Sequence, residues 1–221
     1  MPVRKSTVMH KGFVADRWFG HASKTSFFAA LKCLRGRNRG LFWWRMKSGN
    51  PLAALLDTPE VPDLGPGQRG GVRTIKDLES AIASAGGNRP SGELLGGLVL
   101  LWHDHLDASH EIAQEIESVD GSYLHAIMHR REPDYSNAKY WFRRVGKHAC
   151  YPQLAREAAD ILKVKGASDL LKKLAPNGDW DAFAFVDACE SVAKKRSAET
   201  EALLRDIQAR EFKLLFEHFS G

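Results

Sequence analysis

Histidines at helical spacing are the first residues of this chain that could do chemistry. His125 and His129 are four residues apart in the segment HAIMH, so both side chains leave the same face of a helix. Neutral imidazole acts as an acid or base near neutral pH and is the commonest metal ligand. Because two ligands do not complete a zinc, iron or manganese site, a third must come from His110, Asp107 or Asp134.

We therefore predict that His110, His125 and His129 serve as ligands of a divalent metal (Zn, Fe or Mn) or as catalytic acid and base groups. The alternative is a network of hydrogen bonds in which neutral imidazoles join two helices without a metal. A metalloprotease helix has the same histidine spacing but needs Glu after the first histidine, and Ala126 stands there. That activity is excluded as a motif match.

A single long helix is expected over residues 92–117, and it carries further candidates. On that helix His103, His110 and Gln114 fall on one flank, so Gln114 joins the predicted ligand-binding residues. His105 falls inside the apolar stripe, where a core histidine with a satisfied hydrogen bond is the commoner role.

Arginines and aromatic residues surround the turn EPDYSN. Guanidinium groups bind carboxylate or phosphate with two hydrogen bonds and stack on aromatic rings, which favours a small anionic or sugar-like ligand. The predicted ligand-binding residues here are Arg131, Tyr135, Asn137, Trp141 and Arg144. Asn137, Trp141 and Arg144 share one face of a predicted helix.

The arginines could also serve in two ways that need no small ligand. Glu132 and Asp134 could pair with them and stabilise the turn. Alternatively, the surface of arginines and aromatic residues could dock a protein or a nucleic acid, in which case the protein is a module without catalysis.

The elements that must position these residues are helical. Apolar residues recur at helical spacing, Thr74 is a candidate N-cap, and no segment alternates as a strand does. The predicted helices cover residues 74–85, 92–117, 122–130, 136–146, 151–166, 168–175, 179–195 and 198–219. The fold class is all-α, a single-domain bundle of about six to eight helices. Residues 74–221 form this helical domain, after an irregular, Pro/Gly-rich lead-in at residues 46–73.

Residues 1–45 form a basic tail. They hold ten Lys/Arg and one acid, a charge of +9, so the net charge of +5 leaves the other residues at −4. The tail has three interpretations: residues before a true start at Met46, an organellar transit peptide, or a functional basic arm. We expect it to be poorly ordered and unnecessary for folding.

Composition limits the function classes. With 43% hydrophobic and 27% charged residues, the 221-residue chain is typical of a globular domain. No apolar run is long enough for a membrane span. Three widely spaced cysteines favour reduced thiols and a cytoplasmic location. Motifs for nucleotide hydrolysis, dinucleotide binding and acyl transfer are missing from the sequence.

The segment GSYLHAIMHRREPDYSNAKYWFRRVG resembles a family of all-helical proteins of bacteria and fungi without an established activity. DASHEIAQ before it, and WDAFAFVDACE and IQAREFKLLFEHF after it, extend the resemblance from Leu94 to the C-terminus. The resemblance implies where the site lies and implies no reaction. Family members tend to carry Trp where this chain has Leu124, which implies a smaller pocket wall here.

Overall fold

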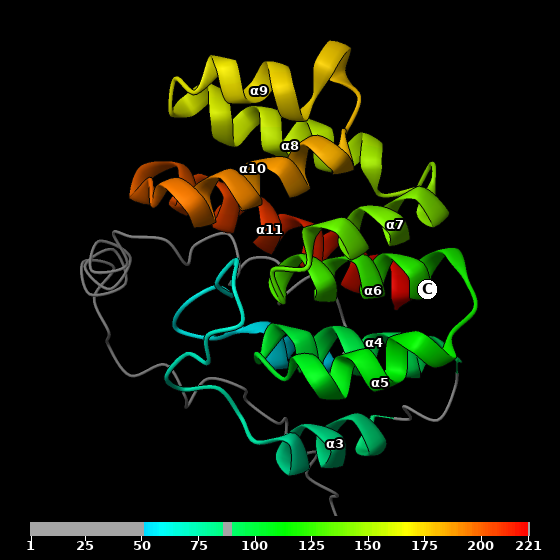
Figure 1. Ribbon diagram of the computed structural model, residues 1–221. Helices are drawn as coiled ribbons and strands as arrows, with labels where there is room; N and C mark the ends of the chain where they lie inside the picture. The colour runs from blue at the N-terminus through cyan, green and yellow to red at the C-terminus, as the bar shows by residue number, and fades with distance from the viewer. Residues whose placement is uncertain (1–50, 86–89, 221) are drawn as a thin grey trace, which may run out of the picture. The chain divides into compact units, whose positions relative to one another are not determined.

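The structure is a computed structural model, and it describes residues 51–85 and 90–220 (Figure 1). Every regular element in these ranges is a helix, which confirms the all-α prediction and the helical bundle. The predicted tail at residues 1–45, and Met46, lie outside the described residues.

Two short 3₁₀ helices and nine α-helices follow one another along the described ranges. They are η1 (Pro51–Leu56), α3 (Ile75–Ser84), α4 (Pro90–Trp102), α5 (Leu106–Glu115), α6 (Val119–Arg131), α7 (Tyr135–Val145), α8 (Tyr151–Val164), α9 (Ser168–Leu174), η2 (Pro176–Gly178), α10 (Ala182–Lys195) and α11 (Ala198–Phe219). Neighbours in sequence pack in pairs, α4 with α5, α6 with α7 and α8 with α9, and α11 packs on α4 and α8.

Side-chain caps explain where several helices begin. Thr74 caps α3 as predicted, Ser118 caps α6 by accepting from the Gly121 amide at 2.9 Å, and Asp134 caps α7. Gly146 ends α7 with a positive φ of 60°, a conformation that favours glycine.

The long helix predicted over residues 92–117 is wrong, because the chain breaks into α4 and α5 at Asp104. Asp104 has a φ of 66°, in the left-handed region, which interrupts the helix. Its buried carboxylate accepts from Arg69 Nε at 2.8 Å and from Arg131 Nη2 at 2.7 Å. Two buried cations therefore stabilise a break that helical periodicity alone does not show.

Because of this break, His103, His110 and Gln114 do not lie on one side of a single helix, as the sequence had predicted. His103 is buried and bonds the Leu55 carbonyl through Nε2 at 2.8 Å. Gln114 is exposed near the end of α5. His105 is half-buried and bonds the Arg73 carbonyl at 2.7 Å, so its expected hydrogen bond is present.

The lead-in before α3 is more ordered than predicted. Leu52, Leu55 and Leu56 of η1 are buried in the core, and the Thr58 hydroxyl accepts from Trp102 Nε1 at 3.0 Å. Free thiols at Cys150 and Cys189 are buried, in agreement with reduced cysteines. Among the described residues, no helix combines the length and apolarity needed to cross a membrane.

Candidate metal centre

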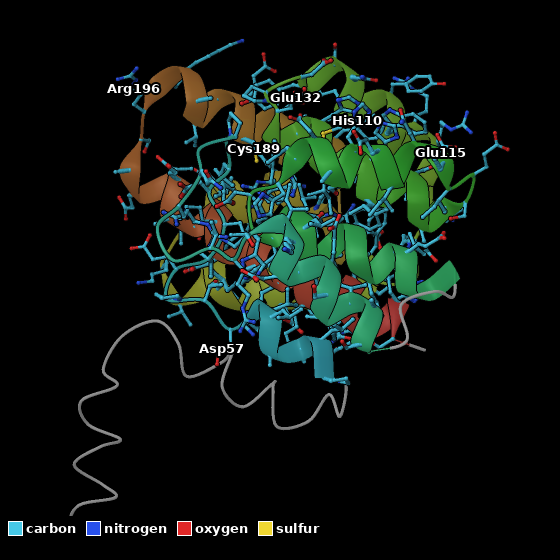
Figure 2. The ribbon with its side chains drawn as sticks, turned by 90° about the horizontal axis from the view of Figure 1, so that it is seen from below. Asp57, His110, Glu115, Glu132, Cys189 and Arg196 are labelled. Carbon is cyan, nitrogen blue, oxygen red and sulfur yellow. The ribbon has the colours of Figure 1, made fainter. Side chains whose placement is uncertain are left out.

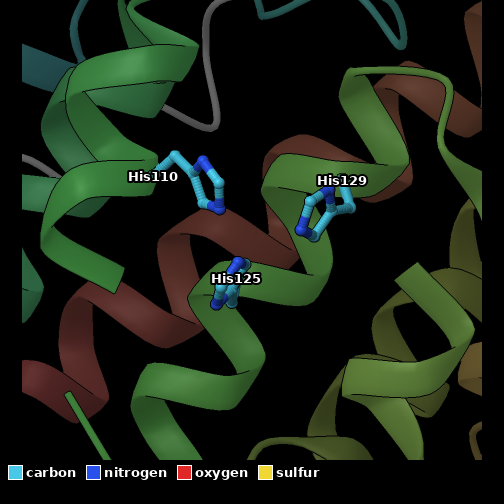
Figure 3. Close-up of side chains that lie close together, drawn as sticks. All are labelled: His110, His125 and His129. Atoms are coloured by element: carbon cyan, nitrogen blue, oxygen red, sulfur yellow. The ribbon is translucent and has the colours of Figure 1, made fainter. Parts of the chain in front are cut away.

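Three predicted histidines come together between α5 and α6 (Figure 3). His110 projects from α5, and His125 and His129 from successive turns of α6. One ring nitrogen of each lies within 4.8 Å of the others. The ring centroid of His110 is 4.7 Å from that of His125 and 5.2 Å from that of His129. The prediction that these three residues meet is therefore confirmed.

His125 is the deepest of the three and is held neutral. It is 3% exposed, and its Nδ1 is buried without a hydrogen-bond partner in the described structure. Burial, with the nearby His129 and His110, lowers the pKa of His125 to about 3. A neutral ring keeps the lone pair that a metal ligand requires.

His129 has the carboxylate support that is common in metal sites. Its Nδ1 lies 3.1 Å from Oε2 of Glu132, which is labelled in Figure 2. This contact assigns the ring proton to Nδ1 and the lone pair to Nε2. Burial lowers the pKa of His129, and the hydrogen bond to Glu132 opposes this. A ligating histidine usually donates its second N–H to such a carboxylate.

Asn137 is the competing partner at this position. Its Nδ2 lies 3.0 Å from His129 Nε2, so the amide bonds the nitrogen that a metal would use. A tetrahedral ion with bonds of about 2.1 Å needs ligand nitrogens roughly 3.4 Å apart. The present spread of up to 4.8 Å therefore requires small inward rotations of the rings and release of the amide.

Trp141 of α7 forms one wall of the cluster. Its ring stacks on His125 at 3.9 Å between centroids and 18° between planes. Arg144 is exposed, and its guanidinium carbon lies 5.2 Å from the Trp141 ring centroid. Asn137 and Trp141 contact the histidines directly and Arg144 contacts Trp141, so their predicted common face is confirmed.

The prediction that Arg131 binds a ligand is wrong. Arg131 is fully buried and donates to the Asp104 carboxylate and to the carbonyls of Leu101, Asp63 and Gly65. Because four hydrogen bonds already use this guanidinium, it has no pair of free N–H donors with which to bind a substrate. It connects the lead-in, the α4–α5 break and the end of α6.

Tyr135 and Gln114 also do not lie at the ligand site where the sequence predicted them. Tyr135 is half-buried toward α10, where burial and the neighbouring Cys189 and Glu190 raise the pKa of its phenol. Gln114 is exposed, and no described contact joins it to the cluster. Neither residue supports the histidine site.

A second group, Asp120, His148 and His218, was not predicted. His148 Nε2 lies 2.9 Å from Asp120 Oδ1, and His218 Nε2 lies 3.1 Å from the same oxygen. His148 Nδ1 accepts the Cys150 amide proton at 3.1 Å, so the ring proton is on Nε2 and points at Asp120. Because both nitrogens of His148 are in use, the group is a hydrogen-bonded cluster with no lone pair on His148 for an ion. Its members are far apart in sequence and share no motif.

Two clefts described in the structure lie elsewhere and are not lined by the three histidines. No known family model, curated protein or solved structure matches this chain.

Proposed function

We propose that the protein is a metal-dependent enzyme in which His110, His125 and His129 hold one divalent transition-metal ion, with zinc the best fit to an all-nitrogen ligand set. The observation that carries this proposal is the convergence of three imidazoles, of which His125 offers a buried Nδ1 with no protein partner among the described residues. Native proteins pair nearly all buried polar atoms, so an unpaired one calls for a partner, and an ion supplies it.

Comparison with the second histidine group supports the choice of His110, His125 and His129 as the metal site. In that group the two ring nitrogens of His148 already bond a carboxylate and a backbone amide. In the first group, Glu132 bonds the nitrogen of His129 that a metal would leave free. The two groups thus contain similar residues, but His125 of the first group has an unpaired ring nitrogen, whereas both ring nitrogens of His148 in the second group are in use.

Three protein ligands suit catalysis better than a structural role. Structural zinc sites use four protein ligands, whereas catalytic sites keep one position for water or substrate. When bound, such an ion lowers the pKa of its water to about 7 and supplies a nucleophile at neutral pH. The exposed Arg144 beside Trp141 is the residue that would attract a small anionic substrate.

Docking of a protein or nucleic acid has less support. Of the four arginines around the turn, Arg130 and Arg131 are buried, which leaves Arg143 and Arg144 exposed. Two exposed cations make a weak electrostatic surface. The buried free thiols of Cys150 and Cys189 accord with a cytoplasmic enzyme.

Metal analysis tests the proposal. Protein purified without chelator should contain about one equivalent of zinc, iron or manganese. Replacing His125 by Ala should remove one of three ligands and lower the bound metal at least tenfold, as measured by elemental analysis after desalting.

The matched control is His218→Ala, which removes a histidine from the hydrogen-bonded group. It should leave the metal content unchanged, because His218 lies outside the proposed ligand set. Metal-free wild-type protein that stays unchanged when zinc, iron or manganese is added would leave only the hydrogen-bond interpretation of the cluster.

A further inference from the structure

A cleft of about 530 Å³ lies where the end of α7 and the start of α8 face η2 and the start of α10. We call it the α7–α10 cleft; its lining includes Lys147, His148, Tyr151, Asp179, Trp180 and Phe183. Its volume is in the range of small-molecule sites, which are mostly apolar with a few placed polar groups. The proposed metal centre uses none of these residues.

Two polar atoms of the lining residues have no partner among the described residues. Trp180 is 8% exposed, and its buried Nε1 makes no hydrogen bond. The buried hydroxyl of Tyr151 is also unpaired. Indole N–H is only a donor, and burial raises the pKa of Tyr151, so the phenol keeps its proton. Both groups call for a hydrogen-bond acceptor.

The charges of the lining residues give the cleft no excess of positive charge for a strongly anionic ligand. Lys147 supplies one positive charge, and Asp179 and Asp181 supply two negative ones. One carboxylate oxygen of Asp181 already accepts the Ala184 amide at 2.9 Å and caps α10. The exposed Asp179 carboxylate can accept from donors of a ligand, while the unpaired groups of Trp180 and Tyr151 require acceptors. A hydroxyl group meets both requirements without charge.

The walls favour a ring-shaped ligand. Tyr151, Trp180 and Phe183 supply aromatic surface, which combines apolar faces with polar edges. His148 belongs to the wall without being reactive, because Asp120 and the Cys150 amide occupy its two nitrogens.

We propose that the α7–α10 cleft binds a neutral polyhydroxylated ring, the chemistry of a pyranose sugar. Its ring lies against the aromatic side chains, and its hydroxyls accept from Trp180 Nε1 and Tyr151 Oη and donate to Asp179. Both unpaired atoms lie beneath the wall, so binding includes side-chain rotations of the kind that are common at binding sites.

Ligand-observed saturation-transfer NMR tests the proposal, with methyl α-glucoside and maltose as probes and the full-length protein. Trp180→Phe and Tyr151→Phe retain the rings and remove only the unpaired groups. Each should weaken sugar binding about 3- to 10-fold, the effect of one hydrogen bond. The melting temperature should stay equal or rise, because an unsatisfied buried group has been removed.

Trp141→Phe is the matched control, since Trp141 lies at the histidine cluster, and it should leave sugar binding unchanged. Addition of EDTA should also have no effect, which separates this site from the proposed metal centre. Glucose 6-phosphate should bind more weakly than methyl glucoside because of Asp179 and Asp181.

Three results would overturn the proposal. One is the absence of saturation transfer from both neutral sugars at millimolar concentration. Another is tighter binding of the phosphate than of the neutral sugar. The third is a lower melting temperature in both Phe variants with unchanged sugar binding, which would assign the two polar groups to buried water.

Discussion

His125 shows at the scale of one residue how burial sets charge. Its folded pKa of about 3 lies below the ordinary value of 6.5. As pH falls below 6.5, the unfolded chain takes up a proton at this residue, and the folded chain does not do so until about pH 3. Metal-free protein should therefore lose stability across this window, by up to about 1.4 kcal/mol per pH unit from this residue.

Replacing His125 by Gln removes this titration. In EDTA, urea unfolding at about pH 7, 6, 5 and 4 should give a shallower fall in the free energy of unfolding for the variant than for wild type. The stabilities of the two proteins should converge as pH falls. Parallel pH profiles would show that His125 takes up its proton at the same pH in the folded and unfolded chains and would weaken its role as a ligand.

At the scale of elements, the corner where the chain turns from α5 into α6 determines whether the histidines meet. A Cβ on Gly121 would lie 2.1 Å from the Ile116 carbonyl oxygen, so the backbone at this corner is close-packed. Gly121→Ala should push α5 from α6, cost about 1–3 kcal/mol of stability and separate His110 from its partners. Urea unfolding and zinc titration measure the two effects.

Gly96→Ala is the matched control for that prediction. A Cβ there meets only Ile82 side-chain carbons, at 3.5 and 3.6 Å, which is ordinary contact. Because Gly96 lies inside α4, the change should stabilise the helix by up to about 1 kcal/mol and leave zinc affinity unchanged. Equal losses of stability in Gly121→Ala and Gly96→Ala would show that close packing at the corner between α5 and α6 has no special role.

At the scale of the whole molecule, the described part of the lead-in before α3 is an integral part of the fold. The Leu55 carbonyl bonds His103, and the Asp63 and Gly65 carbonyls bond Arg131. A chain that begins at Met46 retains these acceptors and should melt near the temperature of the full chain. A chain that begins at Thr74 leaves Arg131 short of partners and opens the core under η1, so it should lose cooperative unfolding.

Circular dichroism melts of the two shortened chains and the full chain test this prediction. A cooperative melt of the chain from Thr74 would show that the lead-in is dispensable. A drop of several degrees in the chain from Met46 would show instead that residues 1–45 contribute to stability.

The sequence by itself determined most of the helices and part of the site. Thr74 and Gly146 mark helix ends through local backbone requirements, and each depends only on a few neighbours along the chain. The pairing of His125 with His129 and the common face of Asn137 and Trp141 follow from helical spacing alone. Such features are readable because the two partners lie about one helical turn apart along the chain.

Only the tertiary structure decided the features that join distant residues. Arg130 and Arg131 are adjacent in sequence, yet one pairs with Glu211 of α11 and the other with Asp104. Asp104 breaks a helix through partners 35 and 27 residues away. The sequence likewise does not indicate that the buried Nε1 of Trp180 lacks a hydrogen-bond partner among the described residues. Hydrogen bonds and charges that are buried by folding depend on which helices meet, and local periodicity does not contain that information.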